Sequence, residues 1–266
     1  MRAGGNTTLT ALASAAESLL AAHRRHHPVI LPTVWDAGSA RIVQEAGFPF
    51  IATSSRAVAG VLGEGDDDAS DAAVIFDFVA RIVRAVSCPV TADLEAGYGL
   101  TATALVGQML AAGIVGCNLE DTDHHGRNVL VDSHRHAAYL ARVRDAAEAV
   151  GVHIVINARV DTFIRHVGGN DEQLEEAIRR GRLYLEAGAD CVYPIAVSDP
   201  GQIATLVDAM PGPVNVLARP GGLRLDELAA LGVARISLGS GLYQLVSNRL
   251  RSAVIALAMG TFLDDV

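Results

Sequence analysis

The sequence predicts an α/β protein built as a closed (β/α)₈ TIM barrel. The first indication is a unit that repeats along the chain, in which a helical pattern ends at a glycine and an apolar, β-branched run follows. Glycine suits the left-handed residue just past a helix, so each unit predicts a passage from helix to strand. The second indication is size, because eight such units in about 250 residues match a barrel of this kind.

Five helical patterns end in this way, at Gly47, Gly113, Gly151, Gly188 and Gly232, and three further strands have proline near their start. The eight strands are expected at about residues 29–33, 49–53, 88–93, 115–119, 152–158, 190–195, 213–217 and 234–238. Helical patterns separate them, for example at 70–86 and 171–188. Near-continuous apolar strands alternating with helices indicate a parallel sheet covered on both faces.

A doubly wound open sheet is the alternative, but no G-x-G-x-x-G motif follows the first strand. No linker is long enough to separate a second domain, so residues 1–266 are expected to form one, with the barrel at about 28–245. A helix at about 8–26 precedes the barrel. An apolar helical segment at about 242–262 follows it, suited to its own barrel or to a neighbouring subunit.

The composition limits the kinds of partner that the protein is expected to bind. The net charge is -9 and the basic residues are scattered, which argues against a nucleic-acid-binding surface. The N-terminal segment lacks an uninterrupted apolar core and no stop-transfer span follows it, so neither a secretion signal nor a membrane anchor is expected. The three cysteines are odd in number and far apart, which indicates buried thiols in a cytoplasmic protein. Small molecules and other copies of the chain are the expected partners.

Polar residues gather where the predicted strands end, which is where barrel enzymes carry their active sites. Asp93 and Glu95 are two residues apart, so on an extended segment both side chains point to one face. Glu120 ends the next strand. Three carboxylates without a sulfur partner are hard oxygen ligands that select Mg²⁺ or Mn²⁺. Any one acid could instead be solvated or cap the next helix, but the set favours a metal site.

Arg159 ends the fifth strand, and its guanidinium fork suits a substrate carboxylate or a developing enolate. An ion pair with a neighbouring acid such as Asp161 is the alternative. Ser54, Ser55 and Arg56 follow the second strand, and their backbone N–H groups could face the same anion. A serine-rich turn that merely leaves the strand is the alternative for this segment.

The polar segment 121–136 follows Glu120 directly and contains His124 and His125. We interpret it as a lid whose histidines could act as acid or base, with a plain surface loop as the alternative. It lacks an H-E-x-x-H motif and cysteine ligands, so a zinc site is disfavoured.

Two other groups of polar residues have simpler interpretations. His23, His26 and His27 are expected on a solvated face of the N-terminal helix. Tyr98 is either a hydroxyl at the barrel mouth or a packed aromatic residue.

The ordered motifs "VWDAGSARIVQEAGFPFIATSS", "LGEGD", "TADLEAGYG", "NLED" and "NARVD" resemble those of the isocitrate lyase / phosphoenolpyruvate mutase superfamily. The resemblance runs from about residue 28 to 245. It implies Mg²⁺-dependent cleavage or formation of C–C or P–C bonds in 2-oxo or 2-hydroxy carboxylates, through an enolate. It also implies a homo-oligomer, dimer or tetramer, whose subunits exchange C-terminal helices.

The resemblance implies substrate-binding roles for five residues. Ser54 and the amides of Ser55 and Arg56 match the segment that binds the substrate carboxylate and the oxyanion. Arg159 matches the substrate-binding arginine, and Asn215 lies near another substrate-facing position.

The resemblance also implies the metal and gating residues. Asp93, Glu95 and Glu120 match the metal-site carboxylates, which act largely through waters, and Asp93 is also expected to meet the substrate. Asp66 in "LGEGD" matches an acid on a gating loop.

One motif departs from the family pattern. Isocitrate and methylisocitrate lyases carry a Lys-(Lys or Arg)-Cys-Gly-His loop after the strand-four acid, and the phosphonomutase has Lys-Asn-Cys. The corresponding segment "DTDHHGRNVLVDSHRH" has neither Lys nor Cys. The chain therefore looks more like the short, cysteine-free branch that includes oxaloacetate decarboxylase and other 2-oxo acid lyases or hydrolases.

The expected function is a Mg²⁺-dependent lyase that cleaves a C–C bond or decarboxylates a small 2-oxo or 2-hydroxy carboxylate through a metal-stabilised enolate. Water, Tyr98 or a lid histidine would complete proton transfer. A phosphonopyruvate-type P–C hydrolase or phosphonomutase is one alternative, and a non-catalytic oligomeric ligand-binding protein is another.

Overall fold

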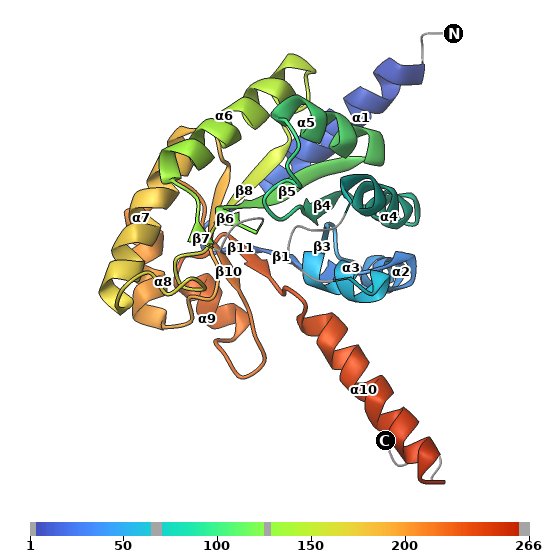
Figure 1. Ribbon diagram of the computed structural model, residues 1–266. Coiled ribbons are helices and arrows are strands. Elements are labelled where there is room, and N and C mark those ends of the chain that lie inside the picture. Colours follow the sequence, from blue (N-terminus) through green and yellow to red (C-terminus); the bar gives the residue numbers. More distant parts are fainter. Residues whose placement is uncertain (1–3, 65–70, 125–128, 261–266) are drawn as a thin grey trace.

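The chain forms a barrel of parallel strands wrapped by helices (Figure 1). The computed structural model describes residues 4–64, 71–124 and 129–260. The strands are β1 (Val29–Leu31), β2 (Thr33–Val34), β3 (Ile51–Thr53), β4 (Val90–Asp93), β5 (Ile114–Glu120), β6 (Thr122–Asp123), β7 (Val129–Leu130), β8 (Val155–Val160), β9 (Cys191–Pro194), β10 (Asn215–Leu217) and β11 (Arg235–Ser237). The helices are α1 (Gly4–Ala21), α2 (Ala37–Glu45), α3 (Ser55–Leu62), α4 (Ala72–Arg84), α5 (Ala102–Ala112), α6 (Ser133–Ala149), α7 (Asn170–Glu186), α8 (Pro200–Ala209), α9 (Leu225–Ala230) and α10 (Gly241–Ala258).

The parallel strands close into a ring. Six pair in the order β2-β3-β4-β5-β8-β9, and three pair in the order β1-β11-β10. β1 and β2 are two parts of one strand separated at Pro32, and a parallel bridge from Val192 to Val214 joins β9 to the β10 side. The result is the eight-strand ring that the sequence predicts, and each expected strand range overlaps an observed parallel strand.

The helix-to-strand passages form for the expected reason. All five glycines that were predicted to end helices have positive φ, and Gly113 is the C-cap of α5 with φ 80°. α4 shows how a helix then covers the sheet. The Asp71 side chain accepts a hydrogen bond from Ala73 N at its start, and Ile75, Phe76 and Val79 pack into the core. Apolar residues at this spacing form one buried face, which fixes the helix on the barrel.

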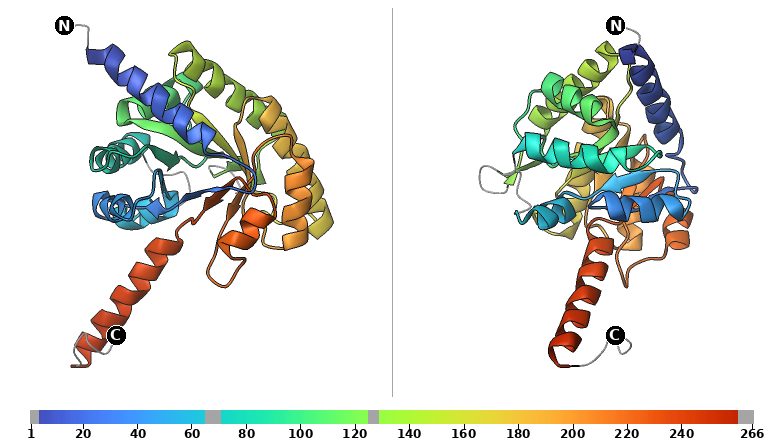
Figure 2. Two further views of the ribbon diagram at one scale, coloured as in Figure 1. Left: turned by 180° about the vertical axis from the view of Figure 1, so that it is seen from behind. Right: turned by 90° about the vertical axis from the view of Figure 1, so that its right-hand side faces the viewer.

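α1 covers the barrel at the end where the strands begin, and Figure 2 shows it crossing the back of the molecule. A Cβ placed on Gly116 of β5 would lie 3.0 Å from Leu19 of α1 and 3.0 Å from the Thr91 hydroxyl. Glycine therefore leaves the room that Leu19 occupies.

The start of the chain corrects two expectations. The first helix ends at Ala21, five residues before the expected end at residue 26. His23 is buried, with 9% of its surface exposed, and its Nδ1 lies 2.8 Å from the carbonyl oxygen of Leu19. The expectation of a solvated histidine is therefore wrong for His23, because the chain turns in toward the barrel there. His26 and His27 are exposed.

The segment expected to be a lid is partly regular structure. Its described parts form the antiparallel hairpin β6-β7 and the first turns of α6, which begins at Ser133. A plain loop is therefore wrong for these residues.

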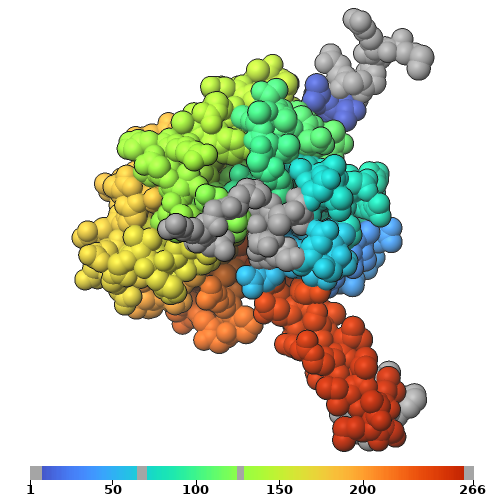
Figure 3. Space-filling model, viewed as in Figure 1, coloured from blue at the N-terminus to red at the C-terminus, as the bar shows by residue number. Residues whose placement is uncertain are grey.

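α10 projects from the barrel (Figures 1 and 3). No residue of α10 is buried, and its exposed apolar side chains are Leu245, Val246, Leu250, Val254, Ile255 and Leu257. At its base Tyr243 packs edge-on against Trp35, with 5.4 Å between the ring centres. Across the described ranges, no helix combines the length and the apolar character that a membrane span requires.

Two buried histidines predict acid sensitivity of the fold. Burial lowers the pKa of His136 from 6.5 to about 4, with the charge of Arg180 acting in the same direction. Burial and the charge of Arg235 lower the pKa of His23 to about 4. Both histidines are therefore neutral when folded but take up a proton below pH 6.5 when unfolded. Their contribution is complete above pH 6.5 and is lost as the pH falls toward 4, by up to about 3 kcal/mol each.

Urea unfolding at pH 7.5, 5.5 and 4.5 measures this loss. We expect His136→Gln to reduce the fall in unfolding free energy, whereas His134→Gln, at an exposed position of the same helix, leaves the fall unchanged. An equal pH dependence in the wild type and His136→Gln would contradict the assignment.

Candidate functional site

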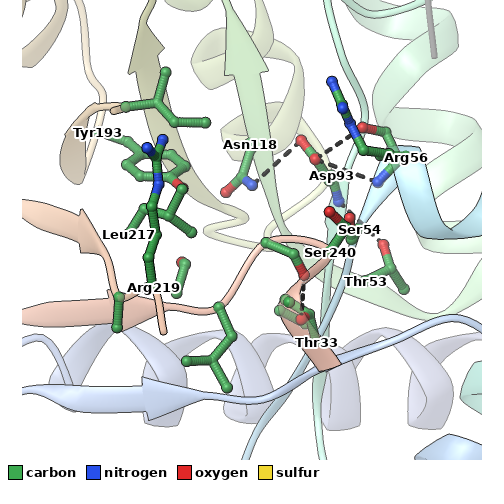
Figure 4. Close-up of a pocket in the computed structure, with 18 of the residues that line it drawn as sticks. Thr33, Thr53, Ser54, Arg56, Asp93, Asn118, Tyr193, Leu217, Arg219 and Ser240 are labelled. Atoms are coloured by element: carbon green, nitrogen blue, oxygen red, sulfur yellow. Dashed lines mark hydrogen bonds between the residues drawn. The ribbon is translucent and has the colours of Figure 1, made fainter. Parts of the chain in front are cut away.

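A cavity of about 470 Å³ opens where the barrel strands end (Figure 4). Every strand of the ring contributes a lining residue: Thr33, Thr53, Asp93, Asn118, Arg159, Tyr193, Leu217 and Ser237. The loops that follow add Ser54, Ser55 and Arg56 on one side, and Arg219 and Ser240 on others. Side chains at the carboxyl ends of all strands therefore meet at one polar site, as the barrel prediction requires.

Asp93 is the only acidic residue among the described residues that line this cavity. It ends β4, and its carboxylate accepts hydrogen bonds from Ser55 N at 3.3 Å, Ser55 Oγ at 3.0 Å and Asn118 Nδ2 at 3.3 Å. Within the described ranges it forms no ion pair, so its negative charge is held by neutral donors. Such a carboxylate can accept a cation at the cavity.

The segment after β3 places the start of α3 beside Asp93. Ser54 is buried at the N-cap of α3, lines the cavity and makes no side-chain capping bond. Ser55 N and Oγ both donate to Asp93, so Ser55 orients this carboxylate, and its role toward a substrate anion stays a prediction. Arg56 is exposed where it lines the cavity. Ser54 and the positive end of α3 are the groups left to attract an anion.

Arg159 lines the cavity and is also held by two acids. Its Nε and Nη2 donate to the Asp161 carboxylate at 2.7 and 3.1 Å, and its Nη1 pairs with Glu120. Burial opposes the charge of Arg159, but Glu120 and Asp161 raise its pKa above the ordinary value. The ion pair that the sequence left as an alternative is present, and it fixes the guanidinium at the cavity wall.

The Glu120 carboxylate is held by Arg159 and His124 and does not line the main cavity. It is 2% exposed, and its two oxygens contact Arg159 and His124 Nε2. Glu120 and His124 line a second cavity of about 290 Å³ beside the β6-β7 hairpin. Burial raises the pKa of Glu120 to about 7, against the opposing charge of Arg159. Its position supports a role in holding Arg159 more directly than a role in binding a metal.

Glu95 follows the end of β4 and does not line the main cavity. β4 ends at Asp93, and Glu95 has a left-handed backbone with φ 50°, so the alternation expected of a strand does not continue to it. The Glu95 carboxylate accepts a hydrogen bond from Tyr98 OH at 3.3 Å, and neither residue lines the two cavities above. Where the chain is described, no three His, Cys, Asp or Glu side chains form a ready metal cluster. Of the three expected metal-site acids only Asp93 lines the main cavity, and Glu95 and Glu120 stay predictions as residues that act through water.

Three other residues predicted for the site are not among the described residues that line the main cavity. Asn215 is fully buried below it and donates to Ser237 Oγ at 3.0 Å. Asp66 and His125 lie outside the described residues.

The lining residues without a role assigned from the sequence include Asn118, Tyr193 and Arg219. In Figure 4, Tyr193 and Arg219 lie opposite Asp93, Ser54 and Arg56, with Asn118 between them. Burial raises the pKa of Tyr193, so its phenol stays neutral. Period-two alternation along the strands could have found Asn118, which precedes Glu120 by two positions, and Tyr193 near the end of β9.

Comparisons with known proteins identify the family of the chain. The family model described as phosphoenolpyruvate phosphomutase matches residues 19–258. The chain is 32% identical to an uncharacterized protein of Mycobacterium tuberculosis, covering 82% of this chain and 81% of the other. It is 28% identical to 2-methylisocitrate lyase of Escherichia coli, over 93% of this chain and 78% of that enzyme.

Solved structures show the same fold. A phosphonomutase-like protein of Burkholderia cenocepacia has a TM-score of 0.86 and 38% identity, covering 91% of this chain and 99% of the other. Oxaloacetate acetylhydrolase in complex with oxalate has a TM-score of 0.82 at 22% identity, covering 92% and 87%. The family match spans nearly the whole barrel and its site. The chain belongs to the phosphoenolpyruvate phosphomutase family, within the isocitrate lyase / phosphoenolpyruvate mutase superfamily.

Proposed function

We propose that the chain is a Mg²⁺-dependent lyase that breaks a C–C bond, or removes a carboxyl group, in a small 2-oxo or 2-hydroxy dicarboxylate through an enolate. The main support is a cavity at the strand ends where one acid, Asp93, faces arginine side chains across a polar floor. The relative named 2-methylisocitrate lyase supports the reaction class. Barrel enzymes of many chemistries share this location, so the side chains decide the reaction.

Asp93 fits a direct ligand of Mg²⁺. Its carboxylate borders the cavity and is oriented by Ser55 and Asn118 without a cationic partner in the described chain. Mg²⁺ in enzymes usually keeps several waters and takes only one or two protein carboxylates, and Mn²⁺ accepts the same oxygen donors. When bound, Mg²⁺ would polarise the substrate carbonyl as a Lewis acid. Glu95 and Glu120 remain predictions as partners that act through water.

The wall beside Asp93 suits the reacting end of the substrate. Ser54 can donate its hydroxyl to a carboxylate, and the start of α3 favours negative charge at this point. Arg159 supplies a fixed positive charge, because Asp161 and Glu120 hold its guanidinium. Groups held in place before the reaction stabilise a developing enolate oxygen without reorganisation.

The opposite wall suits a second acidic group. Arg219 lines both the main cavity and an adjoining cavity of about 240 Å³, and its side chain pairs with no acid of the described chain. A guanidinium binds a carboxylate or phosphonate through paired hydrogen bonds. Arg219 therefore supports a substrate with acidic groups at both ends.

The residues that line the cavity limit which groups can donate the proton. The described lining residues include no His, Lys or Cys. Tyr193 is a neutral phenol at the cavity, and water is the other available donor. Tyr98 and His124, which lie on the side of Glu95 and Glu120, stay predictions as proton carriers.

A homo-oligomer is part of the proposal. α10 projects from the barrel (Figures 2 and 3), and the described residues leave its apolar side chains exposed. Exposed apolar area of this extent on one helix is typical of an interface, and a second copy of the chain is the occupant we propose.

The function is tested with a panel of 2-oxo and 2-hydroxy dicarboxylates and phosphonopyruvate, with Mg²⁺ or excess EDTA. We expect Mg²⁺-dependent C–C cleavage or CO₂ release. Asp93→Asn should weaken Mg²⁺-dependent oxalate binding by on the order of 100-fold or more, since loss of an outer-shell partner alone costs roughly 10- to 100-fold. Asp208→Asn, at an exposed position on α8, is the matched control.

Three outcomes would contradict this proposal in different ways. Phosphate release from phosphonopyruvate alone would identify a P–C hydrolase. Oxalate binding with no turnover would identify a ligand-binding protein. Full activity of Asp93→Asn in excess EDTA would remove the metal mechanism.

Arg219→Gln tests the substrate's second acidic group. Loss of a charge-assisted hydrogen bond costs about 1.5–3 kcal/mol, so we expect malate to bind roughly 10- to 100-fold more weakly. Lactate, which lacks the second carboxylate, should change by less than about threefold because it does not need Arg219. Calorimetry with both ligands in the presence of Mg²⁺ measures the ratio. An unchanged preference for malate over lactate would show that Arg219 does not bind the second carboxylate.

The double variant Leu250→Glu/Val254→Glu tests the interface on α10. Both side chains are exposed and one helical turn apart, so we expect two buried charges to separate the subunits and give a single-chain mass in light scattering. Asn248→Glu, at an exposed polar position of α10, is the control and should keep the oligomer. A wild type that is monomeric at micromolar concentrations would contradict this part of the proposal.

A further inference from the structure

Arg235 is a charged side chain buried inside the barrel. It begins β11 and has no exposed surface. Barrel interiors are usually filled by branched apolar side chains, and a buried charge is costly unless it is paired. Among the described residues Arg235 makes no ion pair, and its Nε and Nη1 have no hydrogen-bond partner. A residue with this cost needs a reason that packing alone does not supply.

Within the described residues, the side chain of Arg235 makes one hydrogen bond, and this bond crosses the barrel. Its Nη2 donates to Asn118 Oδ1 at 3.1 Å. Arg235 is on β11 and Asn118 is on β5, and four steps separate these strands in either direction around the ring. The bond therefore runs through the centre of the barrel, directly below the cavity that Asn118 lines.

The contact decides which way the Asn118 amide points. Guanidinium groups only donate, so Arg235 must meet the amide oxygen. Asn157 Nδ2 donates to the same oxygen at 2.8 Å. With its oxygen held by two donors, Asn118 must turn its NH₂ group toward Asp93, where Nδ2 donates to Oδ1 at 3.3 Å.

The electrostatic environment of Arg235 also connects it to Asp93. Burial lowers the pKa of Arg235, and the acidic groups that act against this are Cys191, Tyr193, Cys117 and Asp93. Asp93 is the only carboxylate among them. Arg235 and Asp93 thus form a separated pair of opposite charges with the Asn118 amide between them, and low-polarity surroundings strengthen such a chain.

We propose that Arg235 is a positioning residue of the site: it fixes the Asn118 amide, which in turn holds the Asp93 carboxylate facing the cavity. The role rests on the proposed function, since Asp93 is the group whose orientation matters there. Arg235 touches neither substrate nor metal. Its effect on ligand binding passes through Asn118.

A double-mutant cycle separates this role from a structural one. Arg235→Met removes the charge and the fork, and Asn118→Leu removes the amide at similar volume. We expect each single variant to weaken Mg²⁺-dependent oxalate binding about 10- to 30-fold, in the range for outer-shell partners. The double variant should be no weaker than the worse single variant, because both changes break one chain. Arg235→Lys, which keeps a donor cation, should recover part of the loss.

Several results would overturn the proposal. Additive effects in the double variant would show that Arg235 does not act through Asn118. A folded Arg235→Met protein with wild-type oxalate affinity would remove the role altogether. If Arg235→Met does not fold, Arg235→Lys is used in its place. An Arg235→Lys protein that binds oxalate as tightly as the wild type while its Asn118 amide rotates freely contradicts the proposal, because binding then does not depend on a fixed amide.

A second readout does not depend on the proposed function. In the wild type without ligand, the assigned Asn118 side-chain NH₂ signals in NMR should be two distinct resonances protected from exchange. In Arg235→Met or Arg235→Lys this protection should be lost or reduced. If the wild type binds no oxalate but shows the protected amide, the proposed function fails while the chain from Arg235 to Asp93 stands. An unprotected amide in the wild type removes that chain.

Discussion

Burial of charge inside a closed ring of strands is the constraint on which this site depends. A carboxylate or guanidinium in the barrel must find a partner, because an unpaired buried charge costs several kcal/mol. Arg159 meets Asp161 and Glu120, and Asp121 meets Arg180 and Tyr184. In each of these pairs the charged group is satisfied by its partner inside the protein. Asp93 differs, since neutral donors hold it at the cavity and one of these donors, the Asn118 amide, also contacts the buried Arg235.

This pattern sorts the acids of the site by task. Glu120 and Asp161 are occupied in fixing a guanidinium, which then presents a steady positive charge at the cavity wall. Asp93 has no cationic partner among the described residues, which supports the proposal that it binds a cation. The two walls of the cavity therefore differ. Ser54 and the start of α3 lie near Asp93, whereas Arg219 and the neutral phenol of Tyr193 lie opposite. A small acid with two anionic ends fits such a division, because each end meets a different kind of partner.

The barrel could be predicted from the sequence because its signals are local and repeated. A glycine past each helix and a β-branched run after it mark the same passage five times, and Gly113 and its counterparts adopt the expected positive φ. The residues of the cavity's near wall, Ser54, Asp93 and Arg159, could be found as well, since strand ends converge in any barrel.

The sequence was less informative about strand ends and about contacts between distant strands. Glu95 was expected to share a face with Asp93, but β4 ends at Asp93 and Glu95 has a left-handed backbone, so strand alternation does not extend to it. The contacts of Glu120 with Arg159 and His124 are not indicated by any period along the strand. His23 is buried because the chain leaves α1 five residues early. The contact from Arg235 to Asn118 joins residues 117 positions apart, which no local pattern could indicate.

We propose that Asp93 alone among the three acids binds the metal directly. A crystal structure with Mg²⁺ and oxalate would test this proposal. We expect an ion at about 2.1 Å from a carboxylate oxygen of Asp93, with oxalate and waters completing its coordination and with Glu120 still paired to Arg159. An ion held directly by Glu95 and Glu120, or an Asp93 side chain turned onto an arginine with no ion beside it, would contradict the account.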